Sequence, residues 1–180
     1  MLNAKAIILV GARDLGRCPL ASRLPTALWS VLGKPVLERL LSHLADQGIR
    51  QAVVCCNGER QLLAESIRAD DRIKLEFCDE LLPVGTAGCI RDAAAGKSDE
   101  LLVVLPASTT CPPEIDWLVS EHLRGRADLT VFLNPCRKKE SHTGQASGIY
   151  LCNSDIIQHI PEVGYFDIKD MCIPVMSLED

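Results

Sequence analysis

The stretch Lys5-Ala-Ile-Ile-Leu-Val-Gly11 decides the fold that we expect for this chain. A short, continuous apolar run that ends in glycine is typical of a strand buried on both faces of a parallel sheet. Apolar residues from 34 to 49 then recur at every third and fourth position, which predicts a helix with Pro35 in its first turn and Gly48 at its C-terminal cap. Residues 51–56 return to a continuous apolar run. The chain is therefore expected to open with a β-α-β unit.

The same alternation continues along most of the chain. Further helices are expected at about 62–67, 85–95, 115–123, 155–160 and just before Pro174, and further strands at 73–77, 101–105, 129–133 and 147–152. This order predicts an α/β fold over a single domain, 1–180, with right-handed crossovers and a mostly parallel sheet covered by helices on both faces. Such sheets bind ligands beyond the carboxyl ends of their strands, which here means the loops after Val10, at 80–88 and after Leu105.

Composition excludes several classes of protein. The 180 residues carry a formal net charge of −5 and no lysine- or arginine-rich run, so a nucleic acid is not the expected partner. No apolar run approaches the length of about 18 residues that a membrane span requires. The nine cysteines are odd in number, include no Cys-x-x-Cys pair and lie partly in apolar runs, which favours small buried side chains over a zinc or disulfide framework. We therefore expect a reduced, cytoplasmic protein.

The loop Gly11-Ala-Arg-Asp-Leu-Gly-Arg17 directly follows the first expected strand. Backbone N–H groups at Gly11 and Ala12 would suit a phosphate, and Arg13 and Arg17 would supply positive charge. Two glycines after a strand are also what a tight turn needs. On the residues of this loop alone, both interpretations stay open.

Four segments carry a wider pattern. In the first segment, 6–11, 18–20, 24–25 and 31–37 stand in the order and at the distances of the motif A-I-I-L-A-A-G-x-G-T-R-L-x-P-L-T-x-x-x-P-K-x-L-x-P-x-x-G-K-P. Leu82-Pro-Val-Gly-Thr-Ala-Gly88 is close to L-G-T-A-G, Ser147-Gly-Ile-Tyr150 to N-A-G-I-Y, and 166–174 to F-D-I-K-E-x-L-I-P. Over nearly its whole length, the chain thus resembles the sugar-1-phosphate nucleotidyltransferases, also called nucleotide-sugar pyrophosphorylases.

The resemblance implies a three-layer, Rossmann-like nucleotidyltransferase fold and a reaction. A sugar-1-phosphate oxygen attacks the α-phosphorus of a nucleoside triphosphate, which gives a nucleotide-sugar and pyrophosphate with the help of Mg²⁺. It also implies that Gly11 and Ala12 contact the nucleotide, and that Gly85, Thr86 and Ala87 contact it on the side of the base. The alternative for the base-side loop is a helix start that needs small residues for close packing.

Two positions depart from the family where its chemistry needs charge. The phosphate-binding lysine of the P-K motif falls on Thr26, in a register that Pro25 fixes. The aspartate of the strand-end N-G-D, which holds Mg²⁺, falls on Ser108. Threonine carries no charge, and a serine hydroxyl is a poor replacement for an anionic ligand of a hard cation.

Other departures concern the first loop, the metal and the sugar side. Asp14 would place a negative charge among triphosphate oxygens, although a shift of one residue could bring Arg13 or Arg17 into play as the catalytic cation. The second metal carboxylate would be Asp170 or, with less support, Asp167, and a surface charge is the alternative for Asp170. The segment 134–146 lacks the family's E-K-P motif, and it is either a solvated loop or a reduced sugar-phosphate site.

Three functions remain in competition at this point. We favour a catalytically impaired or silent relative that senses a nucleoside triphosphate or nucleotide-sugar, or that pairs with an active subunit. An active transferase with shifted ligands and Mg²⁺ is the alternative, and assembly as a homo-oligomer is compatible with either. A scaffold without any ligand is the third, and it predicts a collapsed crevice around Gly11 and Gly85.

Overall fold

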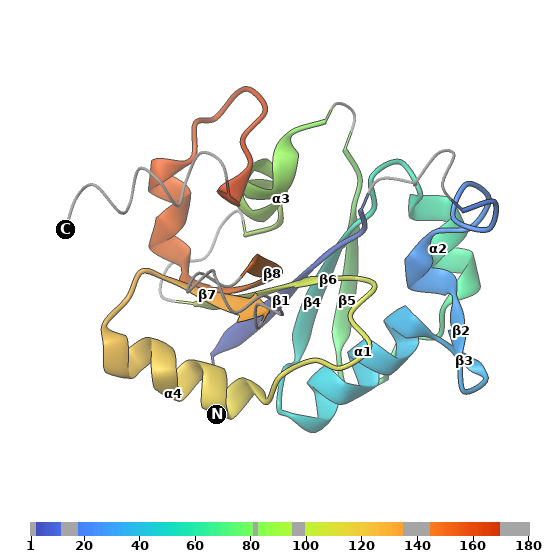
Figure 1. The fold of residues 1–180 in the computed structure, drawn as a ribbon, viewed down its shortest axis with the longest axis horizontal. Helices are drawn as coiled ribbons and strands as arrows, with labels where there is room; N and C mark the ends of the chain where they lie inside the picture. Colours follow the sequence, from blue (N-terminus) through green and yellow to red (C-terminus); the bar gives the residue numbers. More distant parts are fainter. Residues whose placement is uncertain (1–2, 12–17, 81–82, 95–99, 135–144, 170–180) are drawn as a thin grey trace, which may run out of the picture.

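The structure, a computed structural model, describes residues 3–11, 18–80, 83–94, 100–134 and 145–169. Strands and helices alternate in the order that the sequence predicts (Figure 1). In chain order the elements are β1 (Ala4–Leu9), η1 (Thr26–Leu28), β2 (Ser30–Val31), β3 (Lys34–Pro35), α1 (Val36–Asp46), β4 (Gln51–Cys55), α2 (Arg60–Ser66), β5 (Lys74–Cys78), α3 (Gly85–Ala94), β6 (Leu101–Pro106), α4 (Ile115–Gly125), β7 (Leu129–Asn134), β8 (Gln145–Asn153) and η2 (Ser154–His159).

The central sheet has six strands in the order β5-β4-β1-β6-β8-β7. The pairs β4–β5, β1–β4 and β1–β6 are parallel, whereas β8 runs antiparallel to β6 and to β7. Since β7 is antiparallel to a strand that is itself antiparallel to β6, β7 points in the same direction as β6. The prediction of a mostly parallel sheet is confirmed, and β8 is the strand of opposite direction.

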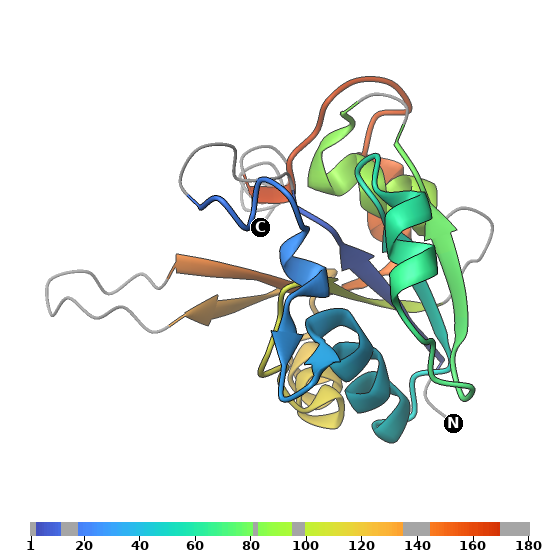
Figure 2. The same ribbon diagram turned by 90° about the vertical axis from the view of Figure 1, so that its right-hand side faces the viewer.

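Helices cover both faces of this sheet, as the alternation predicts (Figures 1 and 2). The side chains of β1 show why, because Ala6 and Ile8 pack in one buried cluster with α1 and α4, and Ile7 packs in the other with α3 and η2. Each strand of the centre is thus apolar on both sides. The three-layer, Rossmann-like α/β fold is confirmed.

One local prediction was wrong, at the start of the first helix. A hairpin of β2 and β3 precedes α1, and its turn residues Leu32 and Gly33 both have positive φ, as a type I′ turn requires. Pro35 belongs to this hairpin and forms the N-cap of α1, so it lies outside the helix that was expected to include it. The short helix predicted at 155–160 is a 3₁₀ helix, and the helix expected before Pro174 lies outside the described residues.

The described cysteines agree with the expectation of buried, unpaired thiols. Seven are free, and Cys55, Cys56, Cys89 and Cys152 are buried. Burial raises the pKa of the Cys152 thiol to about 12, so this side chain stays a neutral, apolar group. Among the described helices, none is long and apolar enough to cross a membrane.

Candidate nucleotide site

A cavity of about 210 Å³ opens at the carboxyl edge of the sheet. It lies where β1, β4 and β5 end and where α3 begins. It is lined by Leu9, Val10, Gly11, Cys55, Asn57, Glu80, Pro83, Gly85, Thr86, Cys89 and Tyr165. Two of the three loops that the sequence singled out, after Val10 and at 80–88, therefore meet at one cavity, and the loop after Leu105 does not line it.

The start of α3 is held against a segment far along the chain. The N–H of Phe166 donates to the carbonyl oxygen of Val84 (2.9 Å), and the N–H of Ala87 donates to the carbonyl oxygen of Phe166 (3.0 Å). Gly85 has a φ of +76°, and a Cβ there would lie 2.6 Å from the carbonyl carbon of Phe166. The glycine is thus required by backbone packing as well as by backbone conformation.

Thr86 and Ala87 face the same segment. The Thr86 hydroxyl donates to Oδ2 of Asp167 (3.2 Å) and accepts from the N–H of Ile168 (3.0 Å). Ala87 is fully buried, with its N–H bound to Phe166. Of the three base-side residues proposed from the resemblance, Gly85 and Thr86 line the cavity and Ala87 does not. Their contact with a nucleotide stays a prediction.

Glu80 is the charged side chain among the described residues that line this cavity. Its Oε1 accepts from the Cys89 thiol (2.8 Å), and its Oε2 accepts from the N–H of Val84 (3.3 Å). A hydrogen bond with Cys55, burial and the bond to Glu80 raise the pKa of the Cys89 thiol, so the thiol stays protonated and can donate. No lysine or arginine is among the described residues that line the cavity. Sequence reasoning missed Glu80, and its place two residues after β5, in a predicted ligand loop, was the available signal.

The two uncharged departures from the family lie outside this cavity lining. Thr26 opens η1 and is exposed. Ser108 is also exposed, two residues after β6, where the N–H of Ala107 donates to the carbonyl oxygen of Leu9 (2.8 Å). Ser108 is therefore close to the end of β1, at the strand-end position that the motif alignment gives it.

Several predicted site residues fall in segments that the structure does not describe. These are Ala12, Arg13, Arg17 and Asp170, together with Asp14. Their roles stay predictions from the sequence.

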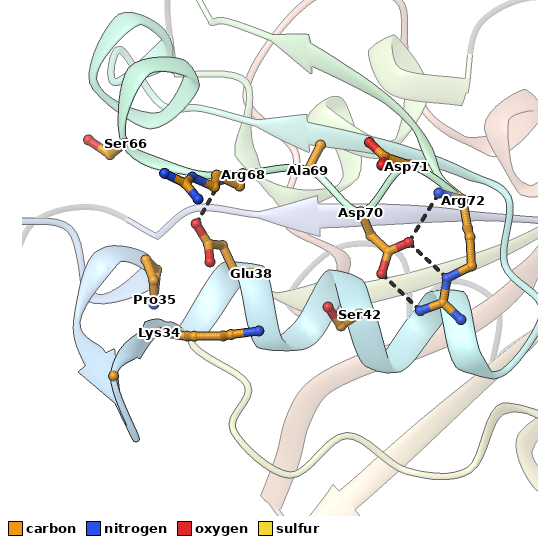
Figure 3. A pocket seen from close by; sticks show the side chains of 11 residues that line it. Lys34, Pro35, Glu38, Ser42, Ser66, Arg68, Ala69, Asp70, Asp71 and Arg72 are labelled. Carbon is orange, nitrogen blue, oxygen red and sulfur yellow. Dashed lines mark hydrogen bonds and ion pairs between the residues drawn. The ribbon is translucent and has the colours of Figure 1, made fainter.

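A larger cavity of about 720 Å³ lies away from the strand ends, between α1 and residues 66–72 (Figure 3). Several of the residues that line it contact one another. Arg72 donates to both oxygens of Asp70, and its hydrogen bonds hold the pKa of that carboxyl well below its usual range. The N–H of Arg68 donates to Oε1 of Glu38 (2.7 Å). These contacts hold residues 66–72 against α1, and they do not indicate a particular class of ligand.

The comparison with protein families supplies the decisive observation. A family model described as nucleotidyl transferase matches residues 5–144, which is most of the chain. The chain belongs to the nucleotidyl transferase family. The resemblance to this family is thereby confirmed, and the matched region contains the first two of the four sequence segments, at 6–37 and 82–88.

Relatives within the nucleotidyl transferase family transfer guanylyl groups to sugar phosphates, according to their names. The chain is 28% identical to the D-glycero-alpha-D-manno-heptose 1-phosphate guanylyltransferase of Aneurinibacillus thermoaerophilus, over 77% of this chain and 60% of that protein. It is 28% identical to the mannose-1-phosphate guanylyltransferase catalytic subunit beta of Drosophila melanogaster, over 97% of this chain and 55% of that protein. The chain thus spans a little more than half the length of these two relatives.

Solved structures agree on the fold. HddC from Yersinia pseudotuberculosis, crystallised with GMP-PN, superposes with a TM-score of 0.76 at 21% identity and covers 95% of this chain and 85% of that one. At this level of identity, the likeness concerns the fold alone.

The described residues include Ser108 and Asp167 from the expected magnesium site of the family, and Asp170 lies outside them. They contain no group of three or more His, Cys, Asp or Glu side chains that could hold a metal ion. Asp167 is the carboxylate nearest in sequence to the expected ligand, and its oxygens accept from the Thr86 hydroxyl and from the N–H of Lys169 (2.9 Å). Ser108 offers a neutral hydroxyl where a hard cation prefers a carboxylate.

The hydroxyl of Tyr150, in the strand motif 147–150, is expected to lower the stability of the fold. Its ring is buried, and its hydroxyl has no hydrogen-bond partner within the described part of the chain. Burial and the nearby charge of Asp167 raise the pKa of Tyr150 to about 12. Because a buried unsatisfied hydroxyl costs about 1–3 kcal/mol, we expect Tyr150→Phe to raise the free energy of unfolding by about 1 kcal/mol in urea titrations at pH 7.

The pH dependence gives the same prediction a second readout. Unfolded tyrosine ionises near pH 10, whereas folded Tyr150 holds its proton to about pH 12, so the unfolded state binds fewer protons between these values. The wild-type protein should therefore lose stability across this window, and the Tyr150→Phe variant should lose less. Tyr165→Phe is the control, because Tyr165 is half exposed. A Tyr150→Phe variant that is less stable than the wild type would contradict this account.

Proposed function

We propose that this chain is a guanine-nucleotide-binding member of the nucleotidyl transferase family whose transfer of nucleotidyl groups to sugar-1-phosphates is impaired or lost. The observation that carries the proposal is the combination of an open cavity at Gly11 and Gly85 with uncharged side chains at Thr26 and Ser108. The names of the two relatives support guanine as the base and a sugar-1-phosphate as the family's second substrate.

Phosphoryl chemistry explains why the two substitutions matter. Transfer of a nucleotidyl group requires positive charge on the developing oxyanions and a metal ion that aligns the two substrates. Thr26 removes the expected cation, and Ser108 removes an expected metal carboxylate. Removing one such contact lowers a rate by about 10²–10³, and losses that concern one transition state act together. Binding of the base needs neither group.

The cavity supports this proposal over a pure scaffold. A scaffold without a ligand predicts that the crevice around Gly11 and Gly85 is closed. Both glycines line an open volume of about 210 Å³ instead. The active alternative requires Arg13 or Arg17 as the cation and Asp170 as a metal ligand, and the metal dependence of binding tests it.

We expect the protein to bind GTP and GDP-sugars saturably in calorimetric titrations. The dissociation constant of GTP should change by less than about threefold when Mg²⁺ is replaced by EDTA, because a weak metal site adds little to binding. Binding that strengthens tenfold or more with Mg²⁺ would favour the active alternative. Absence of binding for every nucleotide would favour the scaffold.

A further inference from the structure

We propose that two copies of this chain associate through the outer edges of their β7 strands, which pair antiparallel and join the two six-stranded sheets into one. The partner at this edge is thus a second copy of the chain. The inference goes beyond the proposed function and does not depend on nucleotide binding, because β6 and β8 lie between β7 and the strands that end at the cavity.

β7 is the last strand of the central sheet, and among the described residues no strand pairs with its outer edge. Its sequence, Leu129-Thr-Val-Phe-Leu-Asn134, contains no charged residue and no proline. Edge strands of natural proteins are commonly protected by such residues against pairing with other chains. The opposite edge strand, β5, has this protection, since Lys74 and Glu76 are exposed and form an ion pair (2.6 Å). The edge of β7 lacks it.

The backbone of β7 presents hydrogen-bonding groups to this open edge. The Ser147 hydroxyl donates to the carbonyl oxygen of Phe132 (2.7 Å), so this carbonyl points towards β8. The backbone groups of successive residues in a strand point to alternate sides, and those of Val131 and Leu133 therefore point away from β8. The bulge between the two strands belongs to β8, where three residues stand opposite one residue of β7. β7 itself is regular and can form a second ladder.

The symmetry of the contact determines which side chains meet. Antiparallel pairing of two identical edges requires a two-fold axis perpendicular to the sheet, which places the same side chains of both copies on the same face. Phe132 packs on the face covered by α4, where the Trp117 ring meets it edge-on at a centroid distance of 6.2 Å. Trp117 is half exposed, as is Leu133 on the other face. Association would bury apolar surface on both faces of the joined sheet.

The charge of the chain favours β7 as the place where two copies meet. Each copy carries a formal net charge of −5, so two copies repel one another in most orientations. Contact along an uncharged strand brings no like charges directly opposite each other. A single strand with a few flanking side chains forms a smaller contact than a standard interface of about 1,600 Å². We therefore expect a weak dimer, with a dissociation constant of about 10–100 µM.

The test compares the oligomeric state of the wild-type protein with that of two leucine-to-lysine variants. Sedimentation equilibrium between about 1 and 300 µM brackets the expected dissociation constant. Leu133→Lys places a charge at the pairing edge and acts twice across the two-fold axis, so it should weaken dimerisation by at least about tenfold. Leu32→Lys is the matched control. It adds the same charge at an exposed leucine in the β2–β3 hairpin, which lies on the other side of the molecule from β7 (Figure 1), and it should leave the dimer unchanged.

Hydrogen exchange of the wild-type protein locates the contact and remains decisive if a variant does not fold. The amides of Val131 and Leu133 should exchange more slowly as the protein concentration rises through the dissociation constant. Residues 74–78, in the edge strand β5, should show no such change and serve as the internal control.

Three results would overturn the inference. A wild-type protein that stays monomeric up to about 300 µM would refute it, including the case in which another segment of the same chain covers β7. A dimer that Leu133→Lys leaves intact, or that both lysine variants weaken equally, would show that the contact lies elsewhere. A dimer without slower exchange at Val131 and Leu133 would show the same. Each result holds whether or not the protein binds a nucleotide, so the proposed function is tested separately.

Discussion

Gly85→Ala should lower the free energy of unfolding by about 2–5 kcal/mol, measured by urea denaturation. Two causes act together at this position. A φ of +76° is unfavourable for any residue with a Cβ, and the added Cβ would lie 2.6 Å from the carbonyl carbon of Phe166 and 3.0 Å from its nitrogen. Backbone atoms cannot rotate away, so either α3 or the segment 166–168 must move.

Gly48→Ala is the matched control for this prediction. Gly48 has a φ of +89° at the end of α1, and a Cβ there would meet no atom within 4 Å. The control should therefore show the conformational cost alone, about 1–2 kcal/mol. The Gly85 variant should also weaken GTP binding, because Gly85 and Thr86 line the cavity. Equal destabilisation by both variants would show that the contact with Phe166 does not constrain Gly85.

The double variant Thr26→Lys with Ser108→Asp should gain Mg²⁺-dependent pyrophosphate release from GTP in the presence of sugar-1-phosphates. Both side chains are exposed, so the fold should tolerate the new charges. The lysine would neutralise phosphate oxygens and the aspartate would provide a metal ligand beside the end of β1. We expect a rate at least about 10² above that of the wild-type protein.

Single variants show whether the two groups act as one unit. Thr26→Lys alone should tighten GTP binding more than it raises turnover, because the metal carboxylate is still missing. Ser108→Asp alone should change little without the cation. A double variant that folds, binds GTP and turns over no faster than the wild type would refute the assignment of these positions to the family's lysine and aspartate.

Much of the fold follows from apolar periodicity. The run from Lys5 to Val10 is apolar on both faces because helices cover both sides of β1, so the sequence pattern and the packing coincide. Periodicity could not predict that β8 enters the sheet between β6 and β7. Strand order depends on long-range pairing, and a buried strand reads alike in either direction. The two-residue strands β2 and β3 were too short to leave a periodic signal.

The sequence predicted the parts of the site that depend on local backbone motifs. It did not predict contacts between side chains that only the folded chain brings together. The glycines at 11 and 85 follow from turn chemistry, and both line the cavity. Thr86 forms hydrogen bonds with residues that lie 81 and 82 positions further along the chain. No local sequence pattern could reveal contacts at such a separation. Glu80 was missed although it lies in a predicted ligand loop, because no motif found in the sequence includes it or its partner Cys89, nine positions further on.

Steady-state pyrophosphate release by the wild-type protein, with saturating GTP, Mg²⁺ and a panel of hexose and heptose 1-phosphates, tests the central claim most directly. Ordinary enzymes turn over at about 1–10³ per second. A family member that binds the base but lacks the cation at position 26 and the carboxylate at position 108 should release pyrophosphate slowly. We expect a rate at least about 10³-fold below the lower end of that range. Turnover of about one per second or faster with any of these sugar phosphates would contradict it.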